Sequence, residues 1–246
     1  MFTVEEREAL RAELVAFGAA DSRIGGVAIT GSAAEDRLDR WSDIDLAFGV
    51  KSEVEVAPVL ADWTSRMYDQ FGALHHLDIT AGAWIYRVFF LANTLQVDLA
   101  FVPQAEFRPL APTFRLASGT ANPAAEIPAA QPEGIIGFAW LYALHVRGCV
   151  ARGKFWQAEY MISGVRDNAL ALACLNRGLA TVHGRGVDLL PAELLLKFQD
   201  ALVRGLEAHE LSRAFRVNVR LLLDEMLLAD AAIAGRLREA LLALAD

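Results

Sequence analysis

In the N-terminal part of the chain, the hydrophobic positions form two kinds of pattern, a helical periodicity and short apolar runs of strand length. Apolar residues recur every three or four positions from Thr3 to Ala20 and from Glu53 to Phe71, which predicts amphipathic helices. Between and after them lie apolar runs of strand length bounded by turn residues, at 24–30, 42–50, 76–80, 84–91 and 95–101. The turns between the last three runs are short and favour antiparallel neighbours. The pattern therefore predicts an α+β domain with a small mixed or antiparallel sheet flanked by helices.

The C-terminal part of the chain has a single spacing, that of helices. Helical periodicity covers residues 134–151, 155–177, 192–207, 211–228 and 231–245, which predicts a helical bundle. Six of the eight prolines lie between Pro103 and Pro132 and mark a boundary between the two patterns. We therefore expect a sheet domain at 1–105, a proline-rich connection at 106–132 and an all-α domain at 133–246.

Composition and charge narrow the classes of function. The formal net charge is −8, which argues against a protein that grips long stretches of nucleic acid. The longest apolar run, Gly134 to Val146, is too short to span a bilayer, and the N-terminus lacks the pattern of a signal peptide. Only two cysteines occur, Cys149 and Cys174, as in reduced proteins. We expect a cytoplasmic protein with no membrane partner, and the long apolar terminal helices leave a homodimer open.

Two short motifs carry candidate chemistry. The predicted strand at 24–30 ends in Gly31-Ser32, a turn in which glycine allows the backbone to approach a phosphate closely. Ten residues later come Asp43 and Asp45, on alternate positions of the next predicted strand. Alternate strand residues share a face and lie about 6.6 Å apart, so two carboxylates there can converge on a divalent cation.

A third carboxylate lies on a later strand. Asp98 alternates with Val97 and Leu99 and therefore projects from the face opposite these apolar residues. Three clustered acids repel one another unless cations neutralise them, so we expect Mg²⁺ at this site.

In this order and spacing, the Gly-Ser turn, the Asp-x-Asp pair and the later Asp98 resemble the nucleotidyltransferase superfamily that includes DNA polymerase beta. The resemblance is strongest to its small bacterial branch of minimal and antibiotic nucleotidyltransferases, some of which add a helical domain. The motif covers residues 24–101, and the layout of a sheet followed by a bundle extends the similarity less specifically over most of the chain.

The resemblance implies roles for individual residues in an in-line nucleotidyl transfer. Asp43 and Asp45 would hold two Mg²⁺ ions, and Asp98 would complete the metal site that activates the attacking hydroxyl. Gly31 and Ser32 would bind the β and γ phosphates of the nucleoside triphosphate. Some relatives use a glutamate as general base, so Asp98, Glu106 or another acid remain alternatives for that role. In the helical domain, which closes over the nucleotide in relatives, the candidates are Lys154 and Arg166 for phosphate and Tyr160 for the base.

The expected function is the transfer of a nucleoside monophosphate, AMP from ATP, to a hydroxyl of a small molecule, with release of pyrophosphate. A cationic acceptor such as an aminoglycoside-like or lincosamide-like antibiotic suits an acidic protein, which would connect the chain to antibiotic resistance. Two alternatives remain open. One is transfer to a protein side chain, as in toxin–antitoxin pairs, and the other is an inactive nucleotide-binding or interaction module.

Overall fold

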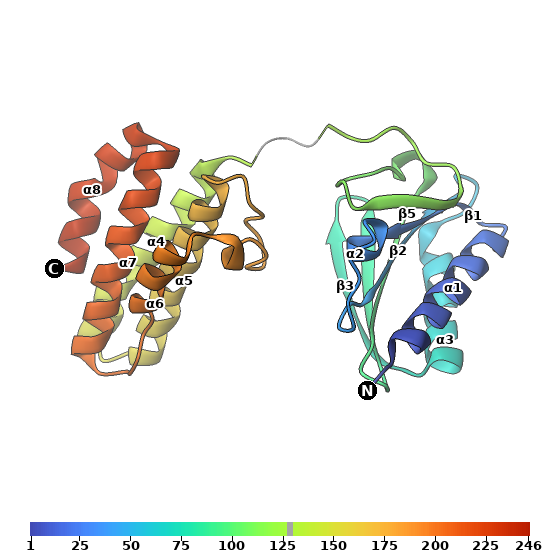
Figure 1. The fold of residues 1–246 in the computed structure, drawn as a ribbon, viewed down its shortest axis with the longest axis horizontal. Helices are drawn as coiled ribbons and strands as arrows, with labels where there is room; N and C mark the ends of the chain where they lie inside the picture. The colour runs from blue at the N-terminus through green and yellow to red at the C-terminus, as the bar shows by residue number, and fades with distance from the viewer. Residues whose placement is uncertain (127–129) are drawn as a thin grey trace. The chain divides into compact units, whose positions relative to one another are not determined.

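The chain folds into two compact units, Met1–Pro128 and Ala129–Asp246 (Figure 1). The structure, a computed structural model, describes residues 1–126 and 130–246. The first unit combines a six-stranded mixed sheet with helices, and the described part of the second unit is helical. The predicted α+β fold followed by a helical bundle is confirmed.

The sheet of the first unit has the strand order β3-β4-β5-β2-β1-β6. Strands β2 and β5 are parallel neighbours, and every other neighbouring pair is antiparallel. The strands are β1 Ile24–Thr30, β2 Ile44–Val50, β3 Ala73–Ala81, β4 Trp84–Leu91, β5 Gln96–Pro103 and β6 Phe114–Gly119. The parallel pair lies in the middle of the sheet, so residues at the same height on β2 and β5 are direct neighbours.

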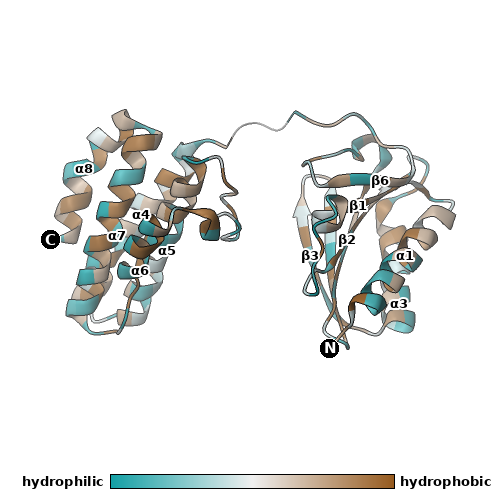
Figure 2. Cartoon of the chain, viewed as in Figure 1, coloured by the Kyte–Doolittle hydropathy of each residue, from teal (hydrophilic) through white to brown (hydrophobic). Residues whose placement is uncertain are grey.

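Helices α1, Val4–Ala20, and α3, Val56–Phe71, cover one face of this sheet (Figure 1). Thr3 and Glu6 form a capping box at the start of α1, which satisfies amide groups that the first helical turn leaves unpaired. Figure 2 shows β1 and β2 mainly in the hydrophobic colours, whereas α1 and α3 alternate, as expected for helices with one buried side. The core on this face is largely made of alternate strand residues and of Leu14, Val59, Trp63 and Met67 from the two helices.

Strand β6 lies inside the segment predicted as a connection. It pairs antiparallel with β1 and forms an edge of the sheet. Prolines surround it and most of its residues are exposed, so the local sequence resembles a loop. The strand depends on its distant partner β1, which a local pattern does not reveal.

The second unit is built from α4 Pro132–Ala151, α5 Phe155–Leu175, α6 Ala192–Asp200, α7 Ala208–Ala229 and α8 Ala231–Ala245. Helix α6 ends seven residues before the predicted bound at 207. The guanidinium group of Arg213 donates hydrogen bonds to the carbonyl oxygens of Asp200 and Leu202, at 2.7 and 2.8 Å, and so satisfies groups beyond the helix end. Gly205, in the same segment, disfavours a longer helix.

Among the described helices, α4 is the one that is long and apolar enough to cross a membrane by length and composition, and 28% of its apolar window is buried. It extends beyond the apolar run at 134–146 on both sides. Core helices of bundles pass the same test, and α4 contributes Ile136, Ala139, Ala143 and Val146 to the core of the second unit.

Candidate active site

The face of the sheet opposite α1 and α3, here called the open face, carries two of the three predicted carboxylates. A small hydrophobic core that includes Ala47, Ala100 and Phe107 covers part of it. Asp45 on β2 and Asp98 on β5 are direct partners in the parallel register. Their strand neighbours Ile44, Leu46 and Leu99 are completely or almost completely buried in the core on the other face. The alternation of side chains along each strand therefore places Asp45 and Asp98 side by side on the open face.

Gly31 brings the Gly-Ser turn into contact with the Asp-x-Asp motif. Its backbone has a φ of +62°, a conformation that favours glycine. A Cβ atom on Gly31 would lie 1.9 Å from Oδ2 of Asp45, so any side chain at this position would collide with the carboxylate. The position therefore requires glycine for two independent reasons.

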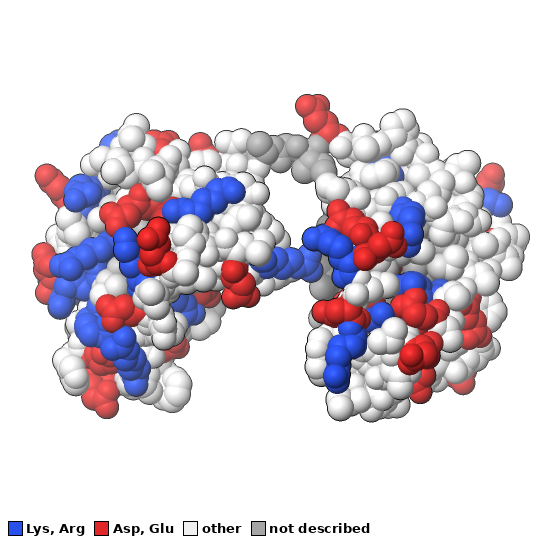
Figure 3. Space-filling view, in the orientation of Figure 1, with Lys and Arg blue, Asp and Glu red and all other residues white. Residues whose placement is uncertain are grey.

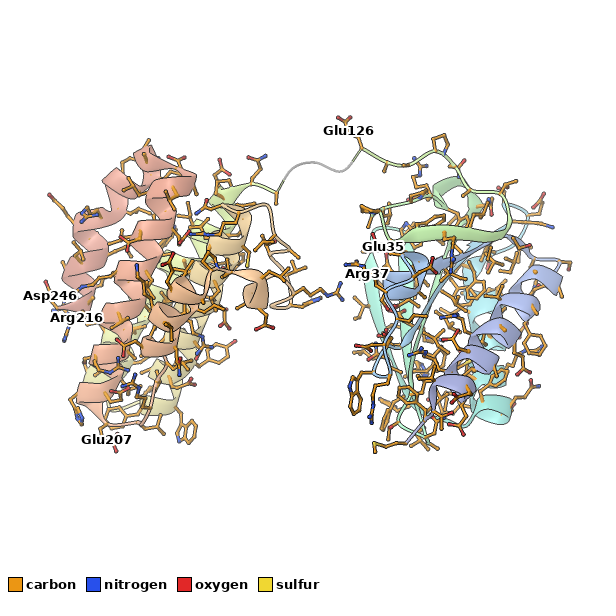
Figure 4. All side chains as sticks on the ribbon, viewed as in Figure 1. Glu35, Arg37, Glu126, Glu207, Arg216 and Asp246 are labelled. Atoms are coloured by element: carbon orange, nitrogen blue, oxygen red, sulfur yellow. The ribbon has the colours of Figure 1, made fainter. Side chains whose placement is uncertain are left out.

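The helix that follows this turn is short. Helix α2 covers only Gly31–Ala34, and the carbonyl oxygen of Ser32 accepts hydrogen bonds from the amides of Glu35 and Arg37. The dipole of one helical turn is weak, so any phosphate contact at Ser32 would depend on its backbone amide and hydroxyl. Glu35 and Arg37, labelled in Figure 4, form an ion pair with each other beside α2.

Asp43 lies just outside the strand in which it was predicted. Strand β2 begins one residue later, at Ile44. The Asp43 carboxylate accepts a hydrogen bond from Nε2 of Gln96, at 3.1 Å, and Gln96 is the first residue of β5. This contact links the entrance of β2 to the strand that carries Asp98.

A buried arginine holds the loop that leads into Asp43. The side chain of Arg7 on α1 is 2% exposed, and its Nη1 atom donates hydrogen bonds to the carbonyl oxygens of Asp39 and Ser42, at 2.5 and 3.1 Å. Neither Arg7 nor Gln96 is among the residues predicted for the site. A signal for Arg7 was present, since it lies on the same helical stripe as Leu14, one of the core residues of α1.

The environment of Asp98 differs from that of an ordinary surface carboxylate. Burial, together with the negative charge of Asp43, raises the pKa of Asp98 to about 6. Its Oδ1 atom is buried and has no hydrogen-bond partner among the described residues. The Tyr86 hydroxyl lies close enough that burial and the charge of Asp98 also raise the pKa of Tyr86. A buried carboxylate oxygen without a partner is expected to bind either a proton or a cation.

The donor chemistry of this site suits Mg²⁺, because Asp43, Asp45 and Asp98 offer only oxygen ligands. The three side chains do not form a preassembled cage. Within residues 1–126 and 130–246, no three histidine, cysteine, aspartate or glutamate side chains are grouped closely enough to hold a metal ion. Asp43 is instead engaged with Gln96, so its carboxylate would have to turn to share a cation with Asp98.

Glu106, the alternative general base, lies at the wrong end of β5. It belongs to the short helix η1, Gln104–Glu106, which follows the strand. From Asp98 to Pro103 the strand rises about 16 Å, at roughly 3.3 Å per residue. The structure therefore separates Glu106 from the carboxylates and leaves Asp98 as the better placed acid.

The three candidates of the helical domain all lie at or near α5 in the second unit. Lys154 is the exposed residue that precedes the helix, and Tyr160 is 63% exposed with its ring against that of Tyr142. The guanidinium group of Arg166 donates two hydrogen bonds to the neighbouring carboxylate of Asp167, at 3.0 and 2.9 Å. Their roles toward the nucleotide stay predictions.

The visible surface of each unit carries charges of both signs. Figure 3 shows acidic and basic side chains interspersed, and no broad basic surface on the face that is drawn. An extended basic surface is the usual footprint of nucleic-acid binding. On the face shown, the charge pattern gives no reason to favour a nucleic-acid acceptor.

Comparison with known proteins finds likeness at the level of solved structures. No protein-family model matches the chain, and no curated protein matches it. Among solved structures, it is similar to the crystal structure of an aminoglycoside 6-adenyltransferase from Bacillus subtilis, with 12% sequence identity and a TM-score of 0.44 over 99% of each chain. A likeness at this level does not transfer residue roles or substrates to the present chain.

Proposed function

We propose that this chain is a Mg²⁺-dependent nucleotidyltransferase that transfers AMP from ATP to a hydroxyl of a small molecule and releases pyrophosphate. The observation that carries the proposal is the meeting of the two motifs on the open face of the sheet. Gly31 lies against the Asp45 carboxylate, and Asp45 lies beside Asp98 in the register of β2 and β5. The sequence motifs are thus neighbours in space as well as in order.

In this proposal, each residue of the site has a separate role in binding or catalysis. The backbone around Gly31 and Ser32 would hold the β and γ phosphates, and Asp43, Asp45 and Asp98 would hold Mg²⁺. When bound, the metal would neutralise phosphate charge and polarise the phosphoryl oxygens. Asp98 would orient the acceptor hydroxyl and accept its proton as the oxygen attacks the α phosphorus. The bond between the α phosphorus and the bridging oxygen breaks, and pyrophosphate leaves.

The setting of this activity is proposed to be the cytoplasm. The reaction consumes a nucleoside triphosphate, and both Cys149 and Cys174 are free thiols buried in the helical unit. Unpaired cysteines are typical of a reducing compartment.

The proposal is tested by following pyrophosphate release with Mg²⁺ and each nucleoside triphosphate against panels of hydroxyl acceptors, RNA and co-purified proteins. We expect acceptor-dependent release with ATP, lost in Asp43→Asn. Release that survives this substitution would contradict the assigned site. Release with only a protein acceptor would favour the toxin–antitoxin alternative, and no release with any acceptor would favour the binding module.

A further inference from the structure

A cavity of about 170 Å³ lies on the same face of the sheet as the carboxylates. Three of its lining residues connect it to the site, since Thr30 precedes Gly31, Ala47 follows Asp45 by two positions and Ala100 follows Asp98 by two positions. Residues two apart on a strand share a face and lie about 6.6 Å apart. The floor of the cavity therefore begins one side chain away from the place where the acceptor hydroxyl must react.

The walls of this cavity are flat and mostly apolar. The rings of Trp84 and Tyr86 are stacked, with centroids 5.9 Å apart and planes inclined by 19°. Phe114 and Leu110 contribute from the segment that follows β5, and the alanines at 47 and 100 leave room between these walls. Aromatic walls of this kind favour a planar group with its faces against the rings.

The cavity is half open to solvent, so its volume does not cap the size of the whole acceptor. It would hold the part of the acceptor that lies against the aromatic rings, and the rest of a larger acceptor would extend into solvent.

The charge that lines the cavity is opposite in sign to the net charge of the protein. Arg108 lines the cavity, and its Nη2 atom donates a hydrogen bond to the carbonyl oxygen of Ala105, at 2.8 Å. Arg108 forms no ion pair with any carboxylate in the part of the chain that the structure describes. Its charge is therefore available to an anionic ligand, and a guanidinium suits a carboxylate well.

We propose that this cavity binds the acceptor, and that the acceptor carries a flat apolar ring with an anionic substituent directed toward Arg108. The inference rests on the nucleotidyltransferase function proposed above and names the substrate class of the same site. It replaces the cationic acceptor expected from net charge, because the charged side chain that lines the cavity itself is that of Arg108. Adenine is the other flat group present in the reaction. In the proposed function, the β and γ phosphates of ATP lie at Gly31 and Ser32, and the uncharged base alone would leave this arginine without a charge partner.

The test uses two probes of the same shape and opposite charge, 4-(hydroxymethyl)benzoate and 4-(hydroxymethyl)benzylamine. Their binding to the full chain is measured by saturation-transfer NMR and calorimetry, neither of which requires turnover. We expect the benzoate to bind about tenfold more tightly than the amine, and Arg108→Gln to remove most of that difference. Ala111→Leu, at an exposed position of the lining, should weaken both probes by filling the space.

Arg66→Gln serves as the matched control, since Arg66 is a half-buried arginine of α3 that lies over the Phe17 ring. It should leave the binding of both probes unchanged. Equal affinity for the two probes, or no effect of Arg108→Gln, would overturn the proposal. Displacement of the benzoate by adenosine would overturn it as well, because the cavity would then be the base pocket. Failure of the proposed reaction would show separately, as absence of pyrophosphate release with every acceptor.

Discussion

In the proposed function, Asp98 combines a chemical role with a cost in stability. Its pKa is raised from 3.8 to about 6 by burial and by Asp43, so the folded state binds the proton more tightly than the unfolded chain does. The stability contributed by the protonated form is therefore present at low pH and is lost as the pH rises from about 4 to about 6. In metal-free protein at higher pH, the charged carboxylate remains a destabilising group.

Asp98→Asn should therefore stabilise the metal-free protein at pH 8 while abolishing transfer. After a discount for partial exposure, we expect the free energy of unfolding to rise by about 2 kcal/mol. Urea denaturation in EDTA at pH 8 and at pH 4.5 checks this, and the difference should shrink at the lower pH. If the variant is less stable than wild type at pH 8, the charged Asp98 carboxylate does not destabilise the folded protein.

Gly31→Ala should disable the site by displacing Asp45. The added Cβ would lie 1.9 Å from Oδ2 of Asp45, and alanine at a φ of +62° costs about 1–2 kcal/mol in addition. We expect at least a hundredfold loss of pyrophosphate release. Gly82→Ala is the matched control, because Gly82 has a φ of +59° with nothing within 4 Å of the added atom. It should lose about 1 kcal/mol of stability and keep its activity. Equal activity of the two variants would contradict the close approach of Gly31 to Asp45.

At the scale of elements, α1 supports the site through a single side chain. Arg7 on α1 holds the carbonyl oxygens of Asp39 and Ser42, directly before Asp43. Arg7→Ala leaves these carbonyl oxygens without their hydrogen-bond donor and creates an empty buried space. We therefore expect the free energy of unfolding to fall by about 2–4 kcal/mol. Well below the melting temperature, we also expect several-fold more Mg²⁺ to be needed for half-maximal activity, because Asp43 is less well placed.

Arg11→Ala provides the comparison for Arg7→Ala on the same helix. The Arg11 side chain is 15% exposed and pairs with Glu8, which also pairs with Arg7. Its removal should cost about 1–2 kcal/mol, with no change in Mg²⁺ dependence. If Arg7→Ala loses stability but keeps the wild-type Mg²⁺ dependence, then Arg7 supports the fold alone. Arg7→Lys keeps the positive charge but loses the planar guanidinium group. Its stability and its Mg²⁺ dependence should lie between those of wild type and Arg7→Ala.

The sequence predicts well those helices and strands whose bounds are set by local signals. The capping signals and periodicity of α1, and the apolar run and bounding turns of β1 and β4, are local, and the structure has these elements at nearly the predicted bounds. Strand β6 and the end of α6 were not predicted, because each depends on a distant partner, β1 for the strand and Arg213 for the helix end.

The same distinction applies to the candidate site. Gly31, Asp45 and Asp98 follow from spacing and alternation, which a sequence displays directly. Arg7 and Arg108 reach the site region from distant segments, one on α1 and one beyond β5. Their contacts exist only after the chain has folded, so the helical stripe can mark Arg7 as buried, but no local pattern shows which groups the two arginines contact.

At the scale of the whole molecule, the sign of the net charge differs from the sign of the charge at the cavity. The chain carries a net charge of −8, yet the cavity beside the carboxylates is lined by an arginine without a carboxylate partner among the described residues. Long-range attraction of a cationic ligand is screened beyond about 8–10 Å at physiological salt. The groups that touch the acceptor should therefore decide its charge.

The central claim, transfer of a nucleoside monophosphate at the paired carboxylates, is tested most directly by following label from ATP. The full chain is incubated with Mg²⁺, an acceptor panel and ATP labelled at either the α or the γ phosphorus. We predict that the α label moves to an acceptor while the γ label leaves as pyrophosphate, and that Asp45→Asn abolishes both at unchanged fold. Transfer of the γ label to an acceptor, or undiminished transfer by Asp45→Asn, would contradict the account.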